Sequence, residues 1–409
     1  MSSNMAYSQP EGYNYDESKV PTYELPPLFE GSTPPSAEAW VKRRTGLINL
    51  FSNQVFGRTP SAGKDTLWWE IRQEIPDALG GIAEMREVRL HFSKESGGPF
   101  ADLLLILPAT RSGAVPVFLG LNFFGNHTIH PEKAITIPGS WMYNYKQAGV
   151  VDHQATEAGR GANAQRWPLE MILERGYGVA TMYYGDLDPD FHDGYKNGIH
   201  PLFERSGDGS DWGAIGAWAW GLSRALDYLQ QSPEVRGDQV AVFGHSRLGK
   251  AALWAGVQDE RFAMVISNDS GCGGAAISRR RFGETVARIN NSFPHWFCDN
   301  FKQYNDQEDD LPVDQHQLLA MVAPRPLYVA SASEDLWADP RGEFLSAQQA
   351  SQVYEWLGKP GLSTKTFPEP GPNSDNQGFV AYHLRPGEHE ILAFDWTAYL
   401  NFADQHFTH

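Results

Sequence analysis

A serine at the end of an apolar run is the residue of this chain whose surroundings most favour chemistry. Residues 240–243 are apolar, residues 244–250 read Gly-His-Ser-Arg-Leu-Gly-Lys, and an alanine-rich run follows at 251–257. This pattern predicts a strand, a sharp turn and a helix, with Ser246 at the turn. A serine held there projects its hydroxyl from the end of a sheet, where it can act as a nucleophile. The alternative is a structural turn serine, because the usual pattern has a small residue where Leu248 stands.

A nucleophilic serine needs a base that takes its proton and an acid that orients this base. In the α/β-hydrolase fold these partners follow the serine in the order acid, then histidine. Asp269 follows the predicted strand 262–267, and Asp335 follows the predicted strand 327–330. Both qualify, because functional residues lie at the carboxyl ends of parallel strands. Asp335 follows the strand that usually supplies the acid. The alternative for each is an ordinary turn aspartate.

His389 is the predicted base, since it lies in the turn-rich segment 385–390 just before the last helix. Three other histidines are weaker candidates. His245 is adjacent to the serine, and adjacent side chains on a tight turn diverge. His316 precedes a helix and is typical of packing or capping. His383 is close enough in sequence to His389 to remain an alternative.

Two cations follow the serine. The backbone N–H of Arg247 is at the position that normally donates to the oxyanion, and its guanidinium could add a charged donor. Lys250 falls in the first turn of the next helix, where it opposes the helix dipole and could reach a substrate hydroxyl. The alternative for both is a solvated charge. The loop 122–127, after the predicted strand 115–121, is the expected source of a second oxyanion donor.

No metal or cofactor is expected. Asp186, Asp188 and Asp190 have the spacing of the first ligands of a calcium loop, but Phe191 and Asn197 stand where glycine and glutamate are required. The sequence has no Cys/His spacing typical of zinc and no glycine-rich loop typical of phosphate binding.

The elements that would position these residues alternate between strands and helices, after three strands that look like an antiparallel lead-in. The predicted strands are 68–74, 87–92, 101–107, 115–121, 178–183, 240–243, 262–267 and 327–330, and the predicted helices are 37–51, 167–174, Ser210 or Asp211 to 231, 251–257, 346–357 and 391–402. Such alternation predicts an α/β-hydrolase fold, a three-layer α/β/α sandwich around a mostly parallel sheet. We expect an extended segment at 1–36 and one catalytic domain at 37–409, with an insertion around 275–320.

The composition limits the function classes. The chain has 409 residues, 41% of them hydrophobic and 20% charged. Its net charge of −17 argues against a nucleic-acid partner, because phosphate binding needs a basic surface. The absence of an apolar run of about 18 residues argues against a membrane-spanning helix. Cys272 and Cys298 are too few for a disulfide framework, and form either one bridge or two buried thiols. The N-terminus has no signal-peptide pattern, so either the protein is intracellular or a leader has been removed.

The segment 244–250, taken as Gly-x-Ser-Arg-x-Gly-Lys, resembles the nucleophile signature of the glucuronoyl esterases, carbohydrate esterase family 15. This resemblance explains the displaced glycine. Further segments are similar to that family, mainly to its bacterial branch, and the resemblance covers most of the chain from about Lys19 onward. They are 269–274, 278–284, 292–297, 323–326, 334–340, and 385–390 followed by Asp395-Trp396.

The resemblance implies a serine esterase that cleaves esters of glucuronic or 4-O-methylglucuronic acid, as in linkages between lignin and glucuronoxylan, through an acyl-enzyme. It implies that Ser246 is the nucleophile, His389 the base and Arg247 the oxyanion stabiliser. It also implies that Lys250, Glu284 and Trp337 contact the uronate sugar. We further expect a monomer without cofactor or metal, located outside the cell or in the periplasm.

The acid stays open between two aspartates. Many family members carry glutamate where Asp269 stands, and aspartate is one methylene shorter. An error of about 1 Å in position can cost roughly 100-fold in rate, so reach favours Asp335, although both carboxylates could contribute. Two other functions also stay open. One is an acetyl or other carboxyl esterase of the same fold, and the other is a catalytically silent carbohydrate-binding relative.

Overall fold

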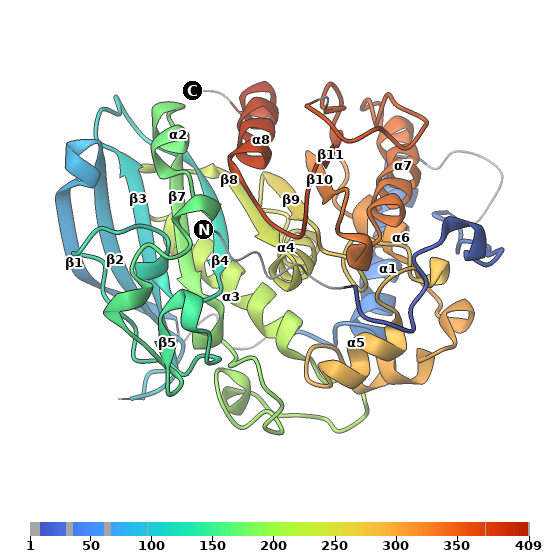
Figure 1. The fold of residues 1–409 in the computed structure, drawn as a ribbon, viewed down its shortest axis with the longest axis horizontal. Coiled ribbons are helices and arrows are strands. Elements are labelled where there is room, and N and C mark those ends of the chain that lie inside the picture. The colour runs from blue at the N-terminus through green and yellow to red at the C-terminus, as the bar shows by residue number, and fades with distance from the viewer. Residues whose placement is uncertain (1–8, 30–35, 61–66, 96, 373, 408–409) are drawn as a thin grey trace.

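A nine-stranded sheet forms the centre of the molecule, and its strands lie in the order β1-β2-β3-β7-β4-β8-β9-β10-β11 (Figure 1). This computed structural model describes residues 9–29, 36–60, 67–95, 97–372 and 374–407. The strands β1, β2 and β3 pair antiparallel, and β3 also pairs antiparallel with β7. From β7 to β11 every neighbouring pair is parallel.

The bounds of the main elements follow. The strands of the sheet are β1 Trp68–Ala78, β2 Ala83–His91, β3 Phe100–Pro108, β4 Val115–Asn122, β7 Gly178–Tyr183, β8 Val235–His245, β9 Met264–Asn268, β10 Leu327–Ala332 and β11 Val380–Arg385. The helices are α1 Ala37–Gln54, α2 Leu169–Glu174, α3 Ala214–Leu229, α4 Arg247–Gln258, α5 Val286–Ser292, α6 Gln315–Ala320, α7 Pro340–Trp356 and α8 Ala393–His406. Two short strands, β5 Val150–Val151 and β6 Gln154–Ala155, form a separate hairpin.

Two hydrophobic cores lie on opposite faces of the sheet, because successive side chains along a strand point to opposite sides. On β4, Val117 and Leu119 belong to one core, and Phe118 belongs to the other. The helices α1, α3, α4, α6 and α7 pack into the first core, whereas α2 and α8 pack into the second (Figure 1). The predicted three-layer α/β/α sandwich with a mostly parallel sheet is therefore confirmed.

The helices α3 and α7 are among those that begin at positions other than the predicted ones. The helix α7 begins at Pro340 rather than Ser346, and proline is well suited to a first helical position because its missing N–H has no partner there. The helix α3 begins at Ala214, so neither Ser210 nor Asp211 caps it. The carboxylate of Asp211 instead accepts backbone N–H groups within its own loop. The cap prediction was therefore wrong.

One strand of the sheet was not predicted at all. The strand β11 is buried along its whole length, although its sequence, Val-Ala-Tyr-His-Leu-Arg, contains polar residue types. His383 and Arg385 are buried there because each has charged or polar partners inside the protein. A pattern of apolar residues cannot identify a strand that is buried in this way.

The described part of the N-terminal segment lies against the region 275–320. The N–H of Gly283 donates to Asn14 O at 2.8 Å, and the guanidinium of Arg280 donates to Glu17 at 2.5 Å. Residues 1–8 and 30–35 of the predicted segment lie outside the described residues. The predicted division into a 1–36 segment and a 37–409 domain stays a prediction.

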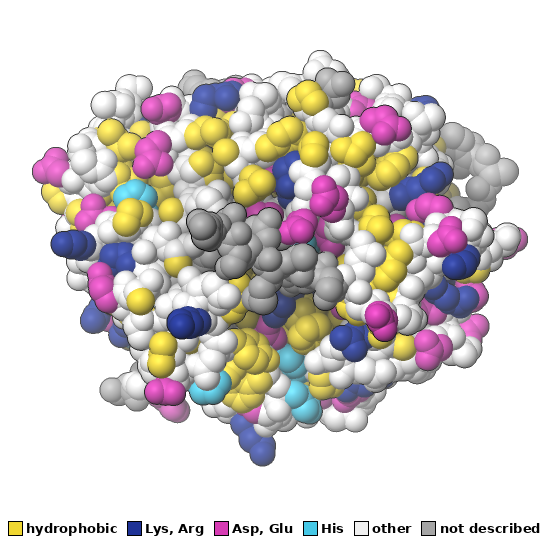
Figure 2. All heavy atoms as spheres, in the orientation of Figure 1, with side chains coloured by type: hydrophobic (Ala, Val, Ile, Leu, Met, Phe, Trp, Pro, Cys, Tyr) yellow, Lys and Arg dark blue, Asp and Glu magenta, His cyan; other side chains and the backbone are white. Residues whose placement is uncertain are grey.

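Cys272 and Cys298 are both free and buried, which agrees with the second of the two cysteine alternatives. Within the described ranges, no helix has the length and apolar character needed to cross a bilayer. On the face of the molecule that Figure 2 presents, acidic and basic side chains are interspersed with hydrophobic ones.

The turn between β8 and α4 depends on close backbone packing. Ser246 has φ 58° and ψ −131°, a conformation that residues other than glycine rarely adopt. A Cβ on Gly244 would stand 2.0 Å from Leu248 O, and a Cβ on Gly249 would stand 3.0 Å from Gly244 O. Both glycines therefore let the strand and the helix approach each other. The side chain of Leu248 is buried in the core, which explains why a large residue fits at its position.

Gly244→Ala should destabilise the protein, because the new methyl group would collide with backbone rather than with a flexible side chain. Overpacking of this kind costs about 1–3 kcal/mol of unfolding free energy, which urea denaturation would measure. The matched control is Gly113→Ala, because a Cβ at Gly113 meets no heavy atom within 4 Å. Equal stability of the two variants would contradict the packing described for the turn.

Candidate active site

Ser246 lies where two cavities meet. One cavity, of about 220 Å³, is lined by Ser246, Arg247 and His389 among others, and a second, of about 620 Å³, is lined by the same three residues. The backbone N–H of Ser246 donates to Asn268 O at 2.9 Å, which ties the turn to the end of β9. The serine therefore stands at the carboxyl end of the parallel strands, with space on two sides. An ester consists of an acyl half and an alcohol half, so each of the two cavities can accommodate one of them.

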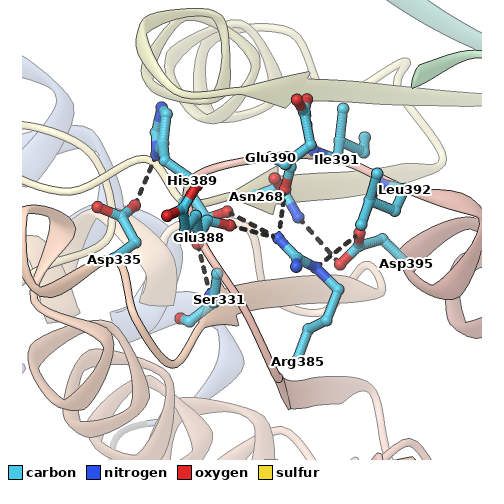
Figure 3. Close-up of polar contacts among 12 residues, drawn as sticks. Asn268, Ser331, Asp335, Arg385, Glu388, His389, Glu390, Ile391, Leu392 and Asp395 are labelled. Atoms are coloured by element: carbon cyan, nitrogen blue, oxygen red, sulfur yellow. Dashed lines mark hydrogen bonds and ion pairs between the residues drawn. The ribbon is translucent and has the colours of Figure 1, made fainter. Parts of the chain in front are cut away.

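His389 pairs with Asp335. The Nδ1–H of His389 donates to Asp335 Oδ2 at 2.6 Å (Figure 3). The other oxygen of this carboxylate accepts the N–H of Ala338 at 3.3 Å. Because Nδ1 is bound to the carboxylate, Nε2 is the ring nitrogen that can act toward Ser246. The structure thus brings together the serine, the histidine and the aspartate that the chain order suggested.

Asp269 lies beside this pair in a different environment. Its Oδ1 accepts the N–H of Ala332 at 2.7 Å, and its Oδ2 lies 4.0 Å from a guanidinium nitrogen of Arg385. Burial and the nearby charge of Asp335 raise the pKa of Asp269 well above its usual range. Among the described residues, ligand atoms of Asp269, Asp335 and His389 lie within 4.8 Å of one another. The His389–Asp335 hydrogen bond accounts for part of this proximity without a metal ion.

Arg385 fixes the loop that carries His389. Its guanidinium donates to the carbonyl oxygens of Pro386, Glu388 and Glu390, at 2.9, 2.8 and 2.8 Å (Figure 3). These carbonyls lie on both sides of His389, so one side chain restrains the whole loop. Arg385 Nε lies 3.2 Å from Asp395 Oδ2, which balances the buried charge. The sequence placed Arg385 in the loop motif but gave it no role.

The other histidines do not take the place of His389. His383 is fully buried, with Nε2 2.8 Å from Asp395 and Nδ1 2.9 Å from the Tyr328 hydroxyl. His245 packs beside His389, with ring centroids 4.4 Å apart. His316 lies on α6, with Nε2 2.9 Å from Pro26 O, which is the packing role considered for it.

Charged groups line the smaller cavity. Lys250 is buried rather than solvated, and its Nζ donates to Ser270 O at 2.6 Å. Burial lowers the pKa of Lys250 and raises the pKa of Glu284, which lines the same cavity. Trp337 forms one wall, and Arg288 of α5, which sequence reasoning missed, is exposed at the same cavity. Oxygen-rich, ring-shaped molecules suit such a mixture of cations, an acid and an aromatic face.

The loop 122–127 borders the larger cavity through Phe123 and Phe124. This location agrees with the position expected for a second oxyanion donor, and the role itself stays a prediction. Tyr145 stacks on Phe124, with ring centroids 5.2 Å apart and an interplanar angle of 14°.

The aspartates with calcium-like spacing each have a separate partner. Asp186 accepts a hydrogen bond from Ser140, Asp188 lies 3.2 Å from His200, and Asp190 forms an ion pair with Arg247. The three carboxylates are thus engaged with different protein groups.

Glu343 is a buried acid that sequence reasoning missed. It lies on α7, where its Oε1 accepts the N–H of Gly271 at 2.9 Å and its Oε2 lies 2.6 Å from Ser331 Oγ. Burial raises the pKa of Glu343 to about 8. We therefore expect Glu343 to support the loop after β9 as a protonated, hydrogen-bonded group at neutral pH.

The fold and the serine at the strand–helix turn define the α/β-hydrolase class. Residues 169–358 match the sequence model of a family described as glucuronyl esterase, fungi. A protein named carbohydrate esterase MZ0003, from an unknown prokaryotic organism, is 50% identical over 98% of this chain and 94% of its own length.

Two solved structures are similar over nearly the whole chain. One is a promiscuous esterase of carbohydrate esterase family 15 from the marine bacterial metagenome, 48% identical with a TM-score of 0.90, covering 97% of this chain and 100% of that one. The other is a glucuronoyl esterase from Solibacter usitatus, 44% identical with a TM-score of 0.89, covering 96% and 100%. The chain belongs to carbohydrate esterase family 15, and it is an ester hydrolase.

Glu343→Gln should flatten the pH dependence of stability. The folded protein holds the Glu343 proton more tightly than the unfolded chain, whose pKa is near 4.5. The stability from this group is therefore complete below pH 4.5 and declines up to about pH 8, by at most about 1.4 kcal/mol per pH unit. Glutamine mimics the protonated acid and should escape this loss, which urea denaturation across that range would measure.

The control for this measurement is Glu355→Gln, on the exposed face of the same helix. It should keep the wild-type slope. A Glu343→Gln variant with the wild-type slope would contradict the proposed protonation of Glu343.

Proposed function

We propose that this protein hydrolyses esters of glucuronic acid through an acyl-enzyme, with Ser246 as nucleophile, His389 as base and Asp335 as the acid that orients the base. One observation carries the proposal. The ring of His389, bound at 2.6 Å to Asp335, shares a cavity with Ser246 at the strained turn. Nothing in a purely structural turn would require this arrangement.

In the first half of the reaction, His389 Nε2 takes the proton of the Ser246 hydroxyl, and the serine oxygen attacks the ester carbonyl. Asp335 holds the ring in the required tautomer and stabilises the imidazolium that forms. The negative charge on the carbonyl oxygen faces the N-terminus of α4 and the guanidinium of Arg247. The imidazolium then gives its proton to the departing alcohol.

In the second half, water attacks the acyl-enzyme with His389 again as base. The serine leaves with the returned proton, and the product is a free glucuronate. The ester is uncharged at its carboxyl and the product is an anion, so the cations near Ser246 favour the direction of hydrolysis at the site.

The sugar of the substrate fits the smaller cavity in this proposal. Lys250 and Glu284 supply a donor and an acceptor for ring hydroxyls, and Trp337 supplies an aromatic wall. The alcohol half then extends into the larger cavity on the other side of Ser246. The names of the related esterases support glucuronate as the acyl half. We propose action outside the cell or in the periplasm, on glucuronoxylan esters, as a monomer.

A broader esterase activity is the second candidate, because one close structural relative is described as promiscuous. Rates on alkyl glucuronates and on acetylated sugars separate the two. A clear preference for acetylated sugars would replace the first proposal.

Ser246→Ala should abolish hydrolysis of benzyl glucuronate, because no other group supplies the acyl acceptor in this mechanism. Loss of the nucleophile typically costs about 10⁶-fold in kcat. The control is Ser232→Ala, a buried serine whose hydroxyl donates to Tyr228 O and which lies outside both cavities. Turnover retained by Ser246→Ala would overturn the assignment.

Asp335→Asn and Asp269→Asn should differ sharply. Asparagine at 335 would present the wrong partner to His389 Nδ1 and lower kcat by about 10⁴-fold. Asparagine at 269 can still accept the N–H of Ala332, so kcat should fall by less than about tenfold. Steady-state kinetics on benzyl glucuronate measure both. Inactivity of the Asp269 variant alone would make Asp269 the acid.

A further inference from the structure

A buried carboxylate, that of Asp190, binds the guanidinium of Arg247. Nη1 of Arg247 forms an ion pair with Oδ2 of Asp190, whose side chain is 1% exposed. We propose that Asp190 is a positioning residue that fixes the Arg247 guanidinium where it stabilises the oxyanion. This inference rests on the proposed role of Arg247.

Asp190 is itself fixed by donors from three other side chains. His295 Nε2 lies 2.8 Å from Oδ1, and Trp296 Nε1 donates to the same oxygen at 2.7 Å. The Tyr184 hydroxyl donates to Oδ2 at 3.0 Å. Together with Arg247, these contacts engage both oxygens of the carboxylate. Asp190 thus joins three parts of the fold: the loop after β7, the start of α4 and the segment after α5.

The carboxylate stays ionised in spite of its burial. Burial alone would raise the pKa of Asp190, but the charge of Arg247 and the hydrogen bonds from His295 and Trp296 hold this pKa below its usual range. An ionised and immobile carboxylate is the partner that a guanidinium needs if it is to stay in one place.

Three aromatic rings also lie around the guanidinium. Its central carbon lies 4.8 Å from the ring centroid of Trp296, 5.5 Å from that of Phe293 and 5.9 Å from that of Phe123. Arginine has many rotamers, and immobilising such a side chain during the reaction would cost conformational entropy. Here the folded protein has already ordered it. Donors fixed before the reaction stabilise a developing charge more than donors that must reorganise.

Asp190 is the last aspartate of the sequence Asp-x-Asp-x-Asp, which does not fit a calcium loop. Asp188, two residues before Asp190, pairs with His200 at 3.2 Å and is equally buried. It belongs to the same loop but contacts a different group. Asp188→Asn is therefore a matched control for damage to the loop.

A double-mutant cycle tests the inference on benzyl glucuronate. We expect Arg247→Ala to lower kcat by about 10²–10³-fold, as for other lost oxyanion donors, and Asp190→Asn by about 10–100-fold with KM changed less than threefold. In the Arg247→Ala background, Asp190→Asn should change kcat by less than about twofold, because its effect passes through the guanidinium. Asp188→Asn should leave kcat within about threefold of wild type.

Tyr184→Phe provides a milder variant if Asp190→Asn does not fold. It removes one hydrogen bond to the carboxylate, and its smaller loss of kcat, about 2–10-fold, should likewise disappear in the Arg247→Ala background. Multiplicative losses in either cycle would overturn the inference, as would unchanged kcat in Asp190→Asn or an equal loss in Asp188→Asn. An active Arg247→Ala variant would instead overturn the proposed role of Arg247 itself.

Discussion

The strained turn at Ser246 is the constraint on which the rest of the structure depends. A positive φ at a serine costs free energy, and the surrounding protein must compensate for it. Two glycines allow β8 and α4 to approach closely enough to hold the turn, and Asn268 accepts the N–H of the serine. The turn then presents the hydroxyl at the junction of two cavities, with the start of α4 beneath it.

Buried partners extend this rigidity to the other residues of the site. Arg385 binds three carbonyls around His389, Asp190 binds Arg247, and Glu343 binds the loop after β9. Each of these three partners is itself buried. The site is thus precise because charges and hydrogen bonds inside the protein, rather than apolar packing alone, fix the loops that carry it.

The sequence predicted the residues that line the cavities better than the buried residues that bind and position them. Ser246, Arg247 and Lys250 fall in one short motif at a strand–helix junction. The end of a predicted strand located Asp335, and the turn-rich loop before the last helix located His389. Asp190, Arg385 and Glu343 are far from that motif along the chain, and their partners are revealed only by the fold. The strand β11 was missed because its polar residues are buried against charged or polar partners, such as Asp395 and Tyr328 for His383. The prediction of where α3 begins was wrong because Asp211 binds backbone N–H groups of its own loop instead of capping the helix.

Three buried acids lie near His389, and their hydrogen bonds differ. Asp269 and Glu343 are fully buried, and burial raises the pKa of each. Their carboxyl oxygens accept the backbone N–H groups of Ala332 and Gly271. The hydrogen bond between Asp335 Oδ2 and His389 Nδ1, at 2.6 Å, instead favours Asp335 as the acid that orients the base. If Asp335 is the acid, as proposed, a shorter residue at 269 is no defect, because Asp269 accepts the N–H of Ala332 at the end of β10 and Asp335 binds His389. In the proposed mechanism, Asp269 thus shapes the end of β10 and Asp335 orients the histidine.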